Sequence, residues 1–351
     1  MTINNKITAK QARFNAQKIA LSPFTFQAVQ VAKKKGILKF LQEHQQGLET
    51  TQISQKLNIS EYGITVLLES CLSIDVVELK DNKWFLSLTG FMFVKDEMTK
   101  VNLDYANDVC YQGLFNLEQS IDKRKPAGLE VFDKDKKYET IYPLLKNLPE
   151  PAKTSWFNFD HFYSDNSFAK ILPIIIKNKA IKLLDVGGNT GKFIKKALEY
   201  DNASKVAMAD LPQQIKTAQE GLLKNKKVKY YPLNVLDDFE LDESYDVIFF
   251  SQFLDCFADE HIPIILEKFK KYLTKNGKIY ILETFWDNQK YEEASFCIVN
   301  TSLYFTAMAN GYSRMYKLTD FENFIKQANL KISNKIENIG FGHTLIELRK
   351  I

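Results

Sequence analysis

Cysteine is scarce in this sequence, and no stretch of it is apolar enough to cross a membrane. Four cysteines occur among 351 residues, and none of them forms a CxxC pair. This spacing argues against a zinc site and against a disulfide framework. No apolar run approaches the roughly 18 residues of a spanning helix, and the polar start MTINNKITAKQARFNAQK lacks the apolar core of a signal peptide. We therefore expect a reduced, cytoplasmic protein without a metal site.

An excess of charge of either sign is also missing. The chain has 47 Lys and Arg against 43 Asp and Glu, which gives a formal net charge of +4. Such a balance gives no signal for binding a polyanion. Hydrophobic residues make up 45% and charged residues 26%, which is typical of a soluble globular protein. At this length the chain can form two domains, each with its own core.

The first hundred residues have the pattern of short helices closed by a hairpin. Apolar residues recur at helical spacing in FQAVQVAKKKGILKFLQE. Two more helices are expected in TTQISQKLNISEYGITVLLESCLSIDVVEL, with Thr51 and Ser60 as N-caps. Two strands joined across KDNK follow in VVELKDNKWFLSLTG. The order predicts an α-helical winged-helix domain over residues 1–100.

Winged-helix domains bind either DNA or another protein chain. A DNA-recognition helix needs Lys or Arg to meet phosphates and base edges. The stretch 59–79 has no Lys or Arg, but it has four acidic residues, Glu61, Glu69, Asp75 and Glu78. We therefore expect protein–protein contact and no nucleic acid. The alternative is a ligand-sensing regulator that binds DNA. A salt-dependent retardation of DNA by the protein would support that alternative.

The next segment, residues 101–170, is expected to be a helical linker with an aromatic-rich end. Six of the thirteen residues in WFNFDHFYSDNSF, 156–168, are aromatic. These aromatic residues either pack between domains, or some residues of the stretch cover a pocket for a flat ligand, with Trp156, Phe159, His161 and Phe162 as candidates. The segment is thus expected to contribute to the binding site.

From about residue 171 onward, strands alternate with helices. Seven strands are expected, at IKLLDV, KVAMAD, VKYYPL, YDVIFF, KIYILE, LKISNKIEN and TLIELR. Helices are expected between the first six, and a short turn at IGFGH before the last. The alternation predicts an α/β fold with a seven-stranded, mostly parallel, Rossmann-like sheet over residues 171–351, and the short turn predicts that the final strand is antiparallel. Ligands of such sheets bind outside the carboxyl ends of the strands.

The first strand is joined to the first helix by a glycine turn within LLDVGGNTGKF. Gly187, Gly188 and Gly191 let the backbone turn tightly and approach a ligand closely. Asp185 precedes them, and its carboxylate would repel the pyrophosphate that a GxGxxG loop binds. A cofactor with an amino group and a sulfonium cation would instead be attracted. This pattern favours S-adenosylmethionine.

A second carboxylate follows at the end of the next strand. Asp210 lies 25 residues after Asp185, where a carboxylate can accept both ribose hydroxyls. Alternatively, or in addition, it caps the helix that begins near Pro212. Asn234 follows the third strand, where it can hydrogen-bond an adenine edge. The residues beside these strand ends complete the expected cofactor site: Leu211, Val235, Ser251 and Gln252.

The ordered motifs LLDVGGNTGKF, ADLP, PLNVLD, YDVIFFSQFLDCFADE and NGKIYILE resemble the class I S-adenosylmethionine-dependent methyltransferases. More narrowly, the chain resembles the O-methyltransferase family with an N-terminal winged-helix dimerisation domain, which includes plant caffeate-type and bacterial hydroxyindole-type enzymes. The resemblance covers essentially the whole chain. It implies a homodimer that methylates a small aromatic, phenolic acceptor. It also implies that Asp185, Gly187 and Gly191 hold the methionine end of the cofactor, Asp210 the ribose and Asn234 the adenine.

Three positions depart from the family pattern. Asn189 stands at a usual glycine, and Asn234 at a usual aspartate. The third departure concerns the family motif LHDWxD after the fourth strand, whose histidine is the general base. Aligned through the aspartates on either side, that histidine position is Asp255 here. Glu283, in YILETF, matches the family glutamate that steadies the histidine.

The role of Asp255 has three alternatives. Beside a second carboxylate its pKa would rise, and it would then take a proton from an acidified phenol. It would otherwise only orient the acceptor, or cap the helix in ADEHIPIILEKF, a role for which Asp259 competes. His161 and His343 are the alternative bases, or they are structural histidines.

Other features leave the chemistry of the acceptor open. Arg314 matches a family segment, and it either binds an acceptor carboxylate or ties down a loop. Without the family histidine, C- and N-methylation are alternatives to O-methylation. A repurposed member that binds the cofactor and performs decarboxylation or hydroxylation is a further alternative.

Overall fold

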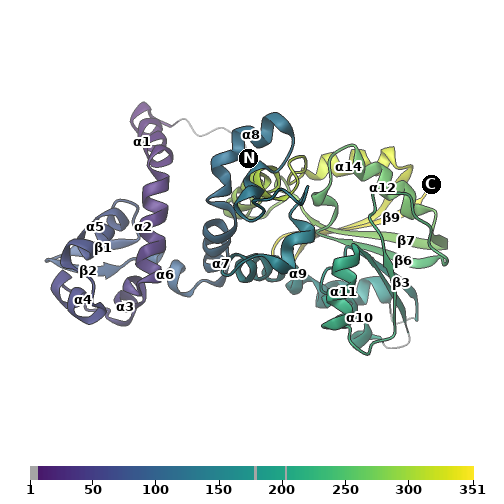
Figure 1. The fold of residues 1–351 in the computed structure, drawn as a ribbon, viewed down its shortest axis with the longest axis horizontal. Coiled ribbons are helices and arrows are strands. Elements are labelled where there is room, and N and C mark those ends of the chain that lie inside the picture. The colour runs from purple at the N-terminus through teal and green to yellow at the C-terminus, as the bar shows by residue number, and fades with distance from the viewer. Residues whose placement is uncertain (1–6, 178–179, 202–203) are drawn as a thin grey trace. The chain divides into compact units, whose positions relative to one another are not determined.

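The computed structural model describes residues 7–177, 180–201 and 204–351. The chain divides into two compact units after Asn107. Figure 1 colours the chain by residue number, with the helices of the N-terminal unit in purple and blue and the strands of the large sheet in green and yellow. Within the described ranges, none of the helices combines the length and the apolar character that a membrane crossing demands.

The N-terminal unit is a helical domain with a two-stranded wing. Its core is formed by apolar side chains from successive helices, among them Val29, Ile37 and Leu68. The elements are α1 (Ala9–Ala20), α2 (Ser22–Lys34), α3 (Ile37–Glu43), α4 (Thr50–Leu57), α5 (Glu61–Leu72), β1 (Val77–Lys80), β2 (Lys83–Leu86), α6 (Leu88–Lys95) and α7 (Glu97–Tyr105). The order of elements expected for the winged helix is therefore confirmed.

Local sequence determines the wing and one of the two expected caps. Asp81 and Asn82 join β1 to β2 with φ of 50° and 59°, which is the backbone of a two-residue hairpin turn. Ser60 caps α5, because its hydroxyl accepts the N–H of Gly63 at 3.1 Å. The cap expected at Thr51 is wrong, since α4 begins one residue earlier and its N-cap is Glu49.

The second unit begins with helical segments and continues into the sheet. Its first elements are η2 (Gly113–Asn116), α8 (Leu117–Lys123), η3 (Ala127–Val131), η4 (Tyr142–Asn147) and the long helix α9 (Ala152–Ile176); a π-helical turn, η1 (Ala106–Cys110), leads into them. The inner side of α9 is apolar, with Phe168, Ile171 and Ile175 buried against the sheet.

All seven expected strands are present in one sheet of order β5-β4-β3-β6-β7-β9-β8. The strands β3 to β7 run parallel, and β9 is antiparallel to both of its neighbours. Their bounds are β3 (Lys182–Val186), β4 (Lys205–Asp210), β5 (Val228–Pro232), β6 (Tyr245–Ser251), β7 (Leu273–Thr284), β8 (Leu330–Ile339) and β9 (His343–Lys350). The predicted fold class, including the antiparallel final strand, is confirmed.

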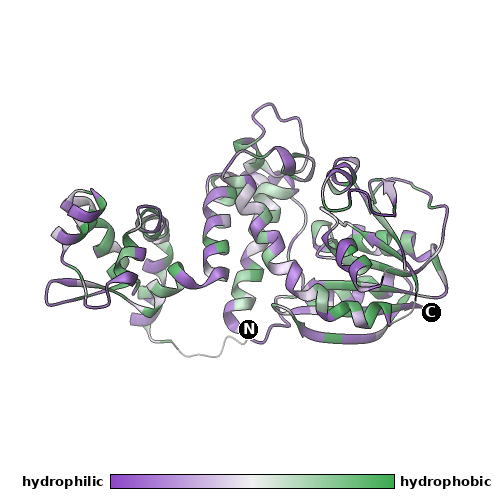
Figure 2. Ribbon diagram, turned by 90° about the horizontal axis from the view of Figure 1, so that it is seen from below, coloured by the Kyte–Doolittle hydropathy of each residue, from purple (hydrophilic) through white to green (hydrophobic). Residues whose placement is uncertain are grey.

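Helices cover both faces of this sheet (Figure 1). One core lies between the sheet and α9, α10 and α11, and the other lies between the sheet and α12 and α14. Figure 2 shows green, hydrophobic segments in the ribbon of the sheet, mixed with purple ones. The residues of β3, β4 and β6 are mostly buried, as expected of strands covered on both faces. The remaining elements are α10 (Lys192–Tyr200), α11 (Pro212–Glu220), η5 (Leu254–Cys256), α12 (His261–Lys270), α13 (Glu292–Tyr304), η6 (Phe305–Ala309) and α14 (Leu318–Gln327).

One expected helix is wrong. The described residues 233–244, between β5 and β6, form a loop. Acidic side chains of this loop bind lysines on the strands: Lys229 Nζ lies 2.7 Å from Glu243 Oε1, and Lys182 Nζ lies 2.8 Å from Glu243 Oε2. These ion pairs fix the loop to β3 and β5, so its acidic residues serve long-range contacts that helical periodicity does not reveal.

Candidate active site

The predicted cofactor residues converge on one edge of the sheet. Because β3, β4, β5, β6 and β7 are parallel, their carboxyl ends lie at the same edge. The antiparallel β9 begins there as well, since His343 pairs with Thr284 near the end of β7. Six of the predicted residues lie at or just beyond this edge: Asp185, Asp210, Asn234, Ser251, Glu283 and His343.

The glycine turn after β3 is built as its sequence predicts. Gly187 and Gly191 have φ of 79° and 82°, which L-residues with side chains rarely adopt. A Cβ on Gly187 would lie 2.1 Å from the ring of Phe253, and one on Gly188 would lie 2.8 Å from Asp185 Oδ2. The turn therefore keeps the backbone close to the Asp185 carboxylate.

Asp185 is buried, and one of its carboxylate oxygens has no hydrogen-bond partner among the described residues. Its exposed fraction is 2%, and its Oδ2 accepts no hydrogen bond from the part of the chain that the structure describes. Burial, and then the charge of Asp210, raise its pKa well above the ordinary value. Unpaired buried polar atoms are rare and costly. Asp185 is thus a candidate to receive a cation or a donor from a ligand.

Asp210 holds the glycine turn from the end of β4. Its Oδ2 accepts the backbone N–H of Asn189 at 2.8 Å, and its Oδ1 accepts that of Leu211 at 2.7 Å. Burial raises the pKa of Asp210 to about 6, although both hydrogen bonds lower it. The alternative in which Asp210 is the N-cap of α11 is wrong, because the N-cap is Leu211.

The other predicted cofactor residues lie along the next strand ends. Asn234 accepts the N–H of Leu236 at 3.1 Å, which leaves its side-chain amide group as a donor. Val235 is buried. Ser251 Oγ, at the end of β6, is buried without a partner among the residues described. Gln252 follows in a left-handed conformation with φ of 46° and donates its N–H to Leu282 at 2.9 Å.

Asp255 and Glu283 form a pair of buried carboxyl groups. Glu283, 1% exposed, accepts the backbone N–H groups of Phe253 and Leu254 at 3.0 Å each through Oε1. Burial, and then the charge of Asp255, raise the pKa of Glu283 well above its ordinary value. Burial raises that of Asp255 to about 6, and its Oδ1 accepts the thiol of Cys256 at 3.6 Å. The two buried carboxyl groups therefore disfavour each other's ionisation.

Neither Asp255 nor Asp259 is the N-cap of α12, so both expected caps are wrong. The helix begins at His261, and its N-cap is Glu260. Asp259 instead accepts Arg314 Nη2 at 3.1 Å, while Arg314 Nη1 donates to Asp320 at 3.2 Å. The guanidinium also lies 4.5 Å from the centre of the Tyr316 ring. The contacts of Arg314 are therefore those of a residue that ties down a loop.

The two candidate histidines are neutral and have different neighbours. His161 Nδ1 on α9 lies 3.5 Å from Asp160 Oδ2, and burial and the charge of Lys192 lower its pKa. His343 is fully buried, its Nδ1 lies 3.2 Å from Ser167 Oγ, and burial lowers its pKa to about 4. His343 is thus packed beneath α9, whereas His161 lies beside a carboxylate.

The aromatic side chains of α9 have separate partners. Trp156 Nε1 donates to Tyr304 Oη at 2.7 Å. The ring centre of Phe159 lies 5.0 Å from that of Tyr163. Phe162 stacks on Phe341, with ring centres 4.7 Å apart. Of these three predicted pocket residues on α9, Trp156 thus contacts α13, Phe162 contacts the turn between β8 and β9, and Phe159 contacts Tyr163 on the same helix.

A polar network beside Asp255 has no signal in the sequence. Asn310 Nδ2 donates to Tyr142 Oη at 3.1 Å and to the carbonyl of Cys256 at 2.9 Å. Burial, and then the charges of Cys256 and Tyr304, raise the pKa of Tyr142 well above its ordinary value. These residues come from segments far apart in the chain, so only the fold brings them together.

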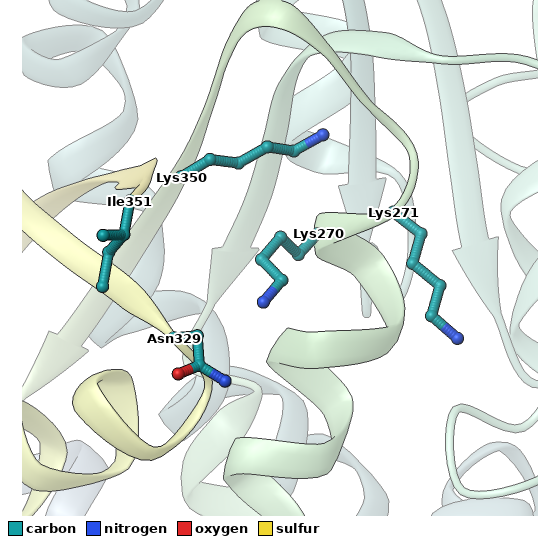
Figure 3. Close-up of a pocket in the computed structure, with 5 residues that line it drawn as sticks. All are labelled: Lys270, Lys271, Asn329, Lys350 and Ile351. Atoms are coloured by element: carbon teal, nitrogen blue, oxygen red, sulfur yellow. The ribbon is translucent and has the colours of Figure 1, made fainter.

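Figure 3 shows a basic depression at the opposite edge of the sheet. It has a volume of about 400 Å³ and lies where α12 ends and β7 begins. Lys270 Nζ is bound by Glu267 and by the carbonyl of Ala328, and Lys350 Nζ by the carbonyl of Leu273. The depression is therefore separate from the carboxyl-end site; its lining residues are Lys270, Lys271, Asn329, Lys350 and Ile351.

Two family descriptions match the chain. Residues 13–84 match a Dimerisation2-like domain, and residues 169–331 match an O-methyltransferase domain. The first range lies within the N-terminal unit, and the second contains the glycine turn, Asp255 and Glu283.

Curated relatives include two O-methyltransferases. The chain is 35% identical over 118 residues to the desmethylxanthohumol 6'-O-methyltransferase of Humulus lupulus, covering 32% of this chain and 31% of that protein. It is 20% identical over 271 residues to the demethylspheroidene O-methyltransferase of Rhodobacter capsulatus, covering 75% and 64%. The chain thus spans less than two thirds of the length of the curated relatives it matches.

Solved structures share the fold. The S-adenosylmethionine-dependent methyltransferase SibL, in its apo form, is similar with a TM-score of 0.70 and 17% identity, over 95% of this chain and 98% of that one. At this identity the similarity concerns the fold. It extends over both units of the chain.

Proposed function

We propose that this chain, which combines a Dimerisation2-like domain with an O-methyltransferase domain, transfers a methyl group from S-adenosylmethionine to a hydroxyl of a small acceptor. The acceptor oxygen attacks the sulfonium methyl, so that an O–C bond forms, the S–C bond breaks and the acceptor loses its proton. The observation that carries the proposal is the buried Asp185 Oδ2, which has no hydrogen-bond partner among the described residues and lies beneath a glycine turn at the carboxyl edge of the sheet.

The residues at this edge fit the cofactor. Asp185 and the backbone of the turn would hold its methionine end, since a buried carboxylate favours an ammonium or sulfonium group. Asp210 has lone pairs besides the two that accept backbone N–H groups, and these suit ribose hydroxyls. Asn234 would meet the adenine edge with its free amide donors. Two buried oxygens that have no partner in the described part of the chain add further acceptors: Asn189 Oδ1 and Ser251 Oγ.

The proton of the acceptor is assigned to Asp255. Its carboxylate is 8% exposed and has a pKa of about 6, which makes it a stronger base than an ordinary aspartate. Glu283, whose pKa is raised by burial and then by the charge of Asp255, supports this state in its neutral form, because a second charge beside Asp255 would be strongly unfavourable. A phenol has a pKa of about 10, so proton transfer accompanies methyl transfer rather than preceding it. The other residues mainly align the acceptor and exclude water.

An aromatic acceptor is the class that the surroundings favour. The helix α9 offers Trp156, Phe159 and Phe162, and the network around Tyr142 and Asn310 offers polar anchors beside Asp255. Flat rings with a hydroxyl suit such a mixed lining. We assign residues 101–170 to the acceptor side and 171–351 to the cofactor side. His161, His343 and Arg314 remain predicted contributors.

We further propose that the chain is a homodimer formed through residues 1–100. Among the described residues, α1 has no buried side chain. Phe14 and Ile19 on α1 are 51% and 76% exposed, and Phe24 on α2 is 71% exposed. Large apolar side chains clustered on a surface mark an interaction site.

Calorimetry with the purified full chain tests the function. S-adenosylmethionine and its demethylated product, S-adenosylhomocysteine, are expected to bind, and Asp210→Ala is expected to abolish the heat of both. The absence of heat with the unmodified chain contradicts the proposal. A panel of phenols, amines and carbon nucleophiles then identifies the methylated atom, and methylation of nitrogen or carbon alone replaces the hydroxyl acceptor.

A further inference from the structure

Asp160 joins the helix α9 to the glycine turn. Its Oδ2 accepts a hydrogen bond from Asn189 Nδ2 at 3.2 Å. The backbone N–H of the same asparagine donates to Asp210 Oδ2 at 2.8 Å. Asn189 has a φ of 50°, so the turn presents its side chain toward α9 while its backbone faces β4. One residue therefore connects a carboxylate of α9 with a carboxylate of the cofactor site.

The charges around Asp160 leave it without a cation of its own. The nearby Asp165 is paired with Lys192, whose Nζ lies 2.7 Å from its Oδ2. Within the described part of the chain, the ion-pair contact of Asp160 is with His161, which is neutral near pH 7 because its pKa is lowered. Burial, and then the charges of Asp165 and Asp255, raise the pKa of Asp160, whereas Lys192 and Asn189 lower it. The Asp160 side chain is 30% exposed, so a ligand can reach it.

A second observation points to a cationic ligand at this turn. Asp185 is 2% exposed, and its Oδ2 has no hydrogen-bond partner among the residues that the structure describes. This oxygen faces the turn, because a Cβ on Gly188 would lie 2.8 Å from it. The turn thus lies between the unpartnered Asp185 below and the Asp160 carboxylate on α9.

We propose that Asp160 selects the charged cofactor: through its bond to Asn189 it places a carboxylate at the glycine turn that binds the sulfonium of S-adenosylmethionine in preference to the uncharged thioether of S-adenosylhomocysteine. This inference rests on the proposed function. The two ligands share the nucleoside and the amino-acid end, and they differ by one methyl group and its positive charge. A carboxylate in a partly buried site interacts with that charge more strongly than it would in water. The attraction ends with methyl transfer, which favours release of the product.

Titration calorimetry of both ligands on the full chain measures how the negative charge of Asp160 affects each Kd. Asp160→Asn keeps a side-chain oxygen for Asn189 and removes the negative charge. It is expected to raise the Kd of S-adenosylmethionine about tenfold, the effect of roughly 1.4 kcal/mol, and to leave the Kd of S-adenosylhomocysteine within about twofold. Asn189→Gly removes the amide bridge but tolerates the left-handed backbone, and it is expected to lower the preference less. Glu199→Gln, which neutralises an exposed carboxylate on α10, is the control and is expected to change neither Kd.

The pH dependence gives an independent readout. Burial raises the pKa of Asp160 to about 7, so its charge appears as pH rises through that value. The ratio of the two Kd values in the unmodified chain is expected to favour S-adenosylmethionine increasingly over this window. In Asp160→Asn that increase is expected to be lost, while the contributions of Asp165, Asp255, His161 and Lys192 remain.

Three outcomes overturn the inference or its premise. Equal weakening of both ligands in Asp160→Asn assigns the residue to the shape of the turn only. Unchanged Kd values for both ligands remove Asp160 from the site. Failure of the unmodified chain to bind either ligand contradicts the proposed function itself, which distinguishes the two failures. A thermal melt of each variant establishes that it is folded.

Discussion

Burial, and then the charge of Asp255, raise the pKa of Glu283, while Glu283 accepts hydrogen bonds from the backbone directly before Asp255. The two residues come from different strand ends, β6 and β7, which are adjacent in the sheet. Glu283 therefore fixes the position of the η5 turn. Under the proposed function, Glu283 is the positioning residue and Asp255 accepts the proton.

Asp255→Asn is expected to lower kcat by about 10²–10⁴-fold, the usual contribution of a general base, because the amide cannot accept the acceptor's proton. The Kd of S-adenosylmethionine is expected to stay within about twofold. Turnover on an identified acceptor and calorimetry of the cofactor measure the two quantities. Asp255→His, which introduces the histidine that the resemblance to the family motif LHDWxD implies for this position, is expected to restore much of the turnover. Unchanged kcat in Asp255→Asn would reduce the residue to a structural role.

The pH profile of kcat/KM follows from the ionisation of Asp255. Burial raises its pKa to about 6, and the base is active only when ionised. Activity is thus expected to rise as pH increases through about 6 and to be lost below it. Asp255→His is expected to retain a rise, with an apparent pKa that reports the imidazole. If the unmodified chain and Asp255→His had identical pH profiles, the rise in activity would belong to another group. Asp210, whose pKa is also raised to about 6, would then be the first candidate.

Asp185→Asn is expected to stabilise the fold and to weaken cofactor binding. The folded pKa of Asp185 is raised, so between the unfolded value of about 3.9 and the folded value the folded chain binds more protons than the unfolded chain. Its contribution to the free energy of unfolding therefore falls as pH rises through that window. Removing the carboxylate is expected to add about 1–3 kcal/mol at pH 7.

Thermal melts at two pH values check the sign of the predicted pH dependence of stability at Asp185. The gain in Tm of Asp185→Asn is expected to be larger at pH 7 than at pH 4. The exposed Asp238→Asn serves as the control and is expected to stay within about 0.5 kcal/mol at both pH values. A gain that does not depend on pH would show that the carboxylate is not the cause.

The strands and the cofactor edge were predictable, because both depend on local and topological rules. A buried parallel strand is an apolar run, and the ends of parallel strands meet at one edge, so Asp185 and Asp210 converge without any knowledge of packing. The caps at Thr51 and Asp259 were not predictable in the same way. Asp259 is drawn to Arg314, which lies 55 positions away in the chain, and Thr51 lies within the first turn of α4.

The acceptor side was less predictable than the cofactor side. Tyr142, Asn310 and Cys256 meet only because η4, the segment after η6 and η5 pack together. Asp160 likewise reaches the glycine turn from α9 through a single hydrogen bond. Neither arrangement has a period or a motif, so the sequence indicated aromatic content there and not its polar contacts.

Gly187→Ala tests the glycine turn against a matched glycine. Gly187 and Gly36 have the same φ of 79°, but a Cβ on Gly187 would lie 2.1 Å from the Phe253 ring, whereas one on Gly36 would meet nothing within 4 Å. Gly36→Ala is expected to cost only the left-handed backbone strain, about 1–2 kcal/mol, and to leave cofactor binding intact. Gly187→Ala is expected to abolish binding of S-adenosylmethionine in calorimetry. Equal retention of binding in both variants would contradict the close approach of this turn to the cofactor.

The exposed apolar surface of α1 allows the proposed dimer to be tested without disturbing a core. Since α1 buries none of its described side chains, the double substitution Phe14→Glu and Ile19→Glu is expected to leave the chain folded. Light scattering is expected to give twice the chain mass of 40.6 kDa for the unmodified protein and the single mass for the variant. Leu222→Glu, on an exposed apolar residue of the second unit, is the control and is expected to remain dimeric. A single mass for the unmodified chain would contradict the proposed dimer. A double mass for the α1 variant would show that the interface does not involve α1.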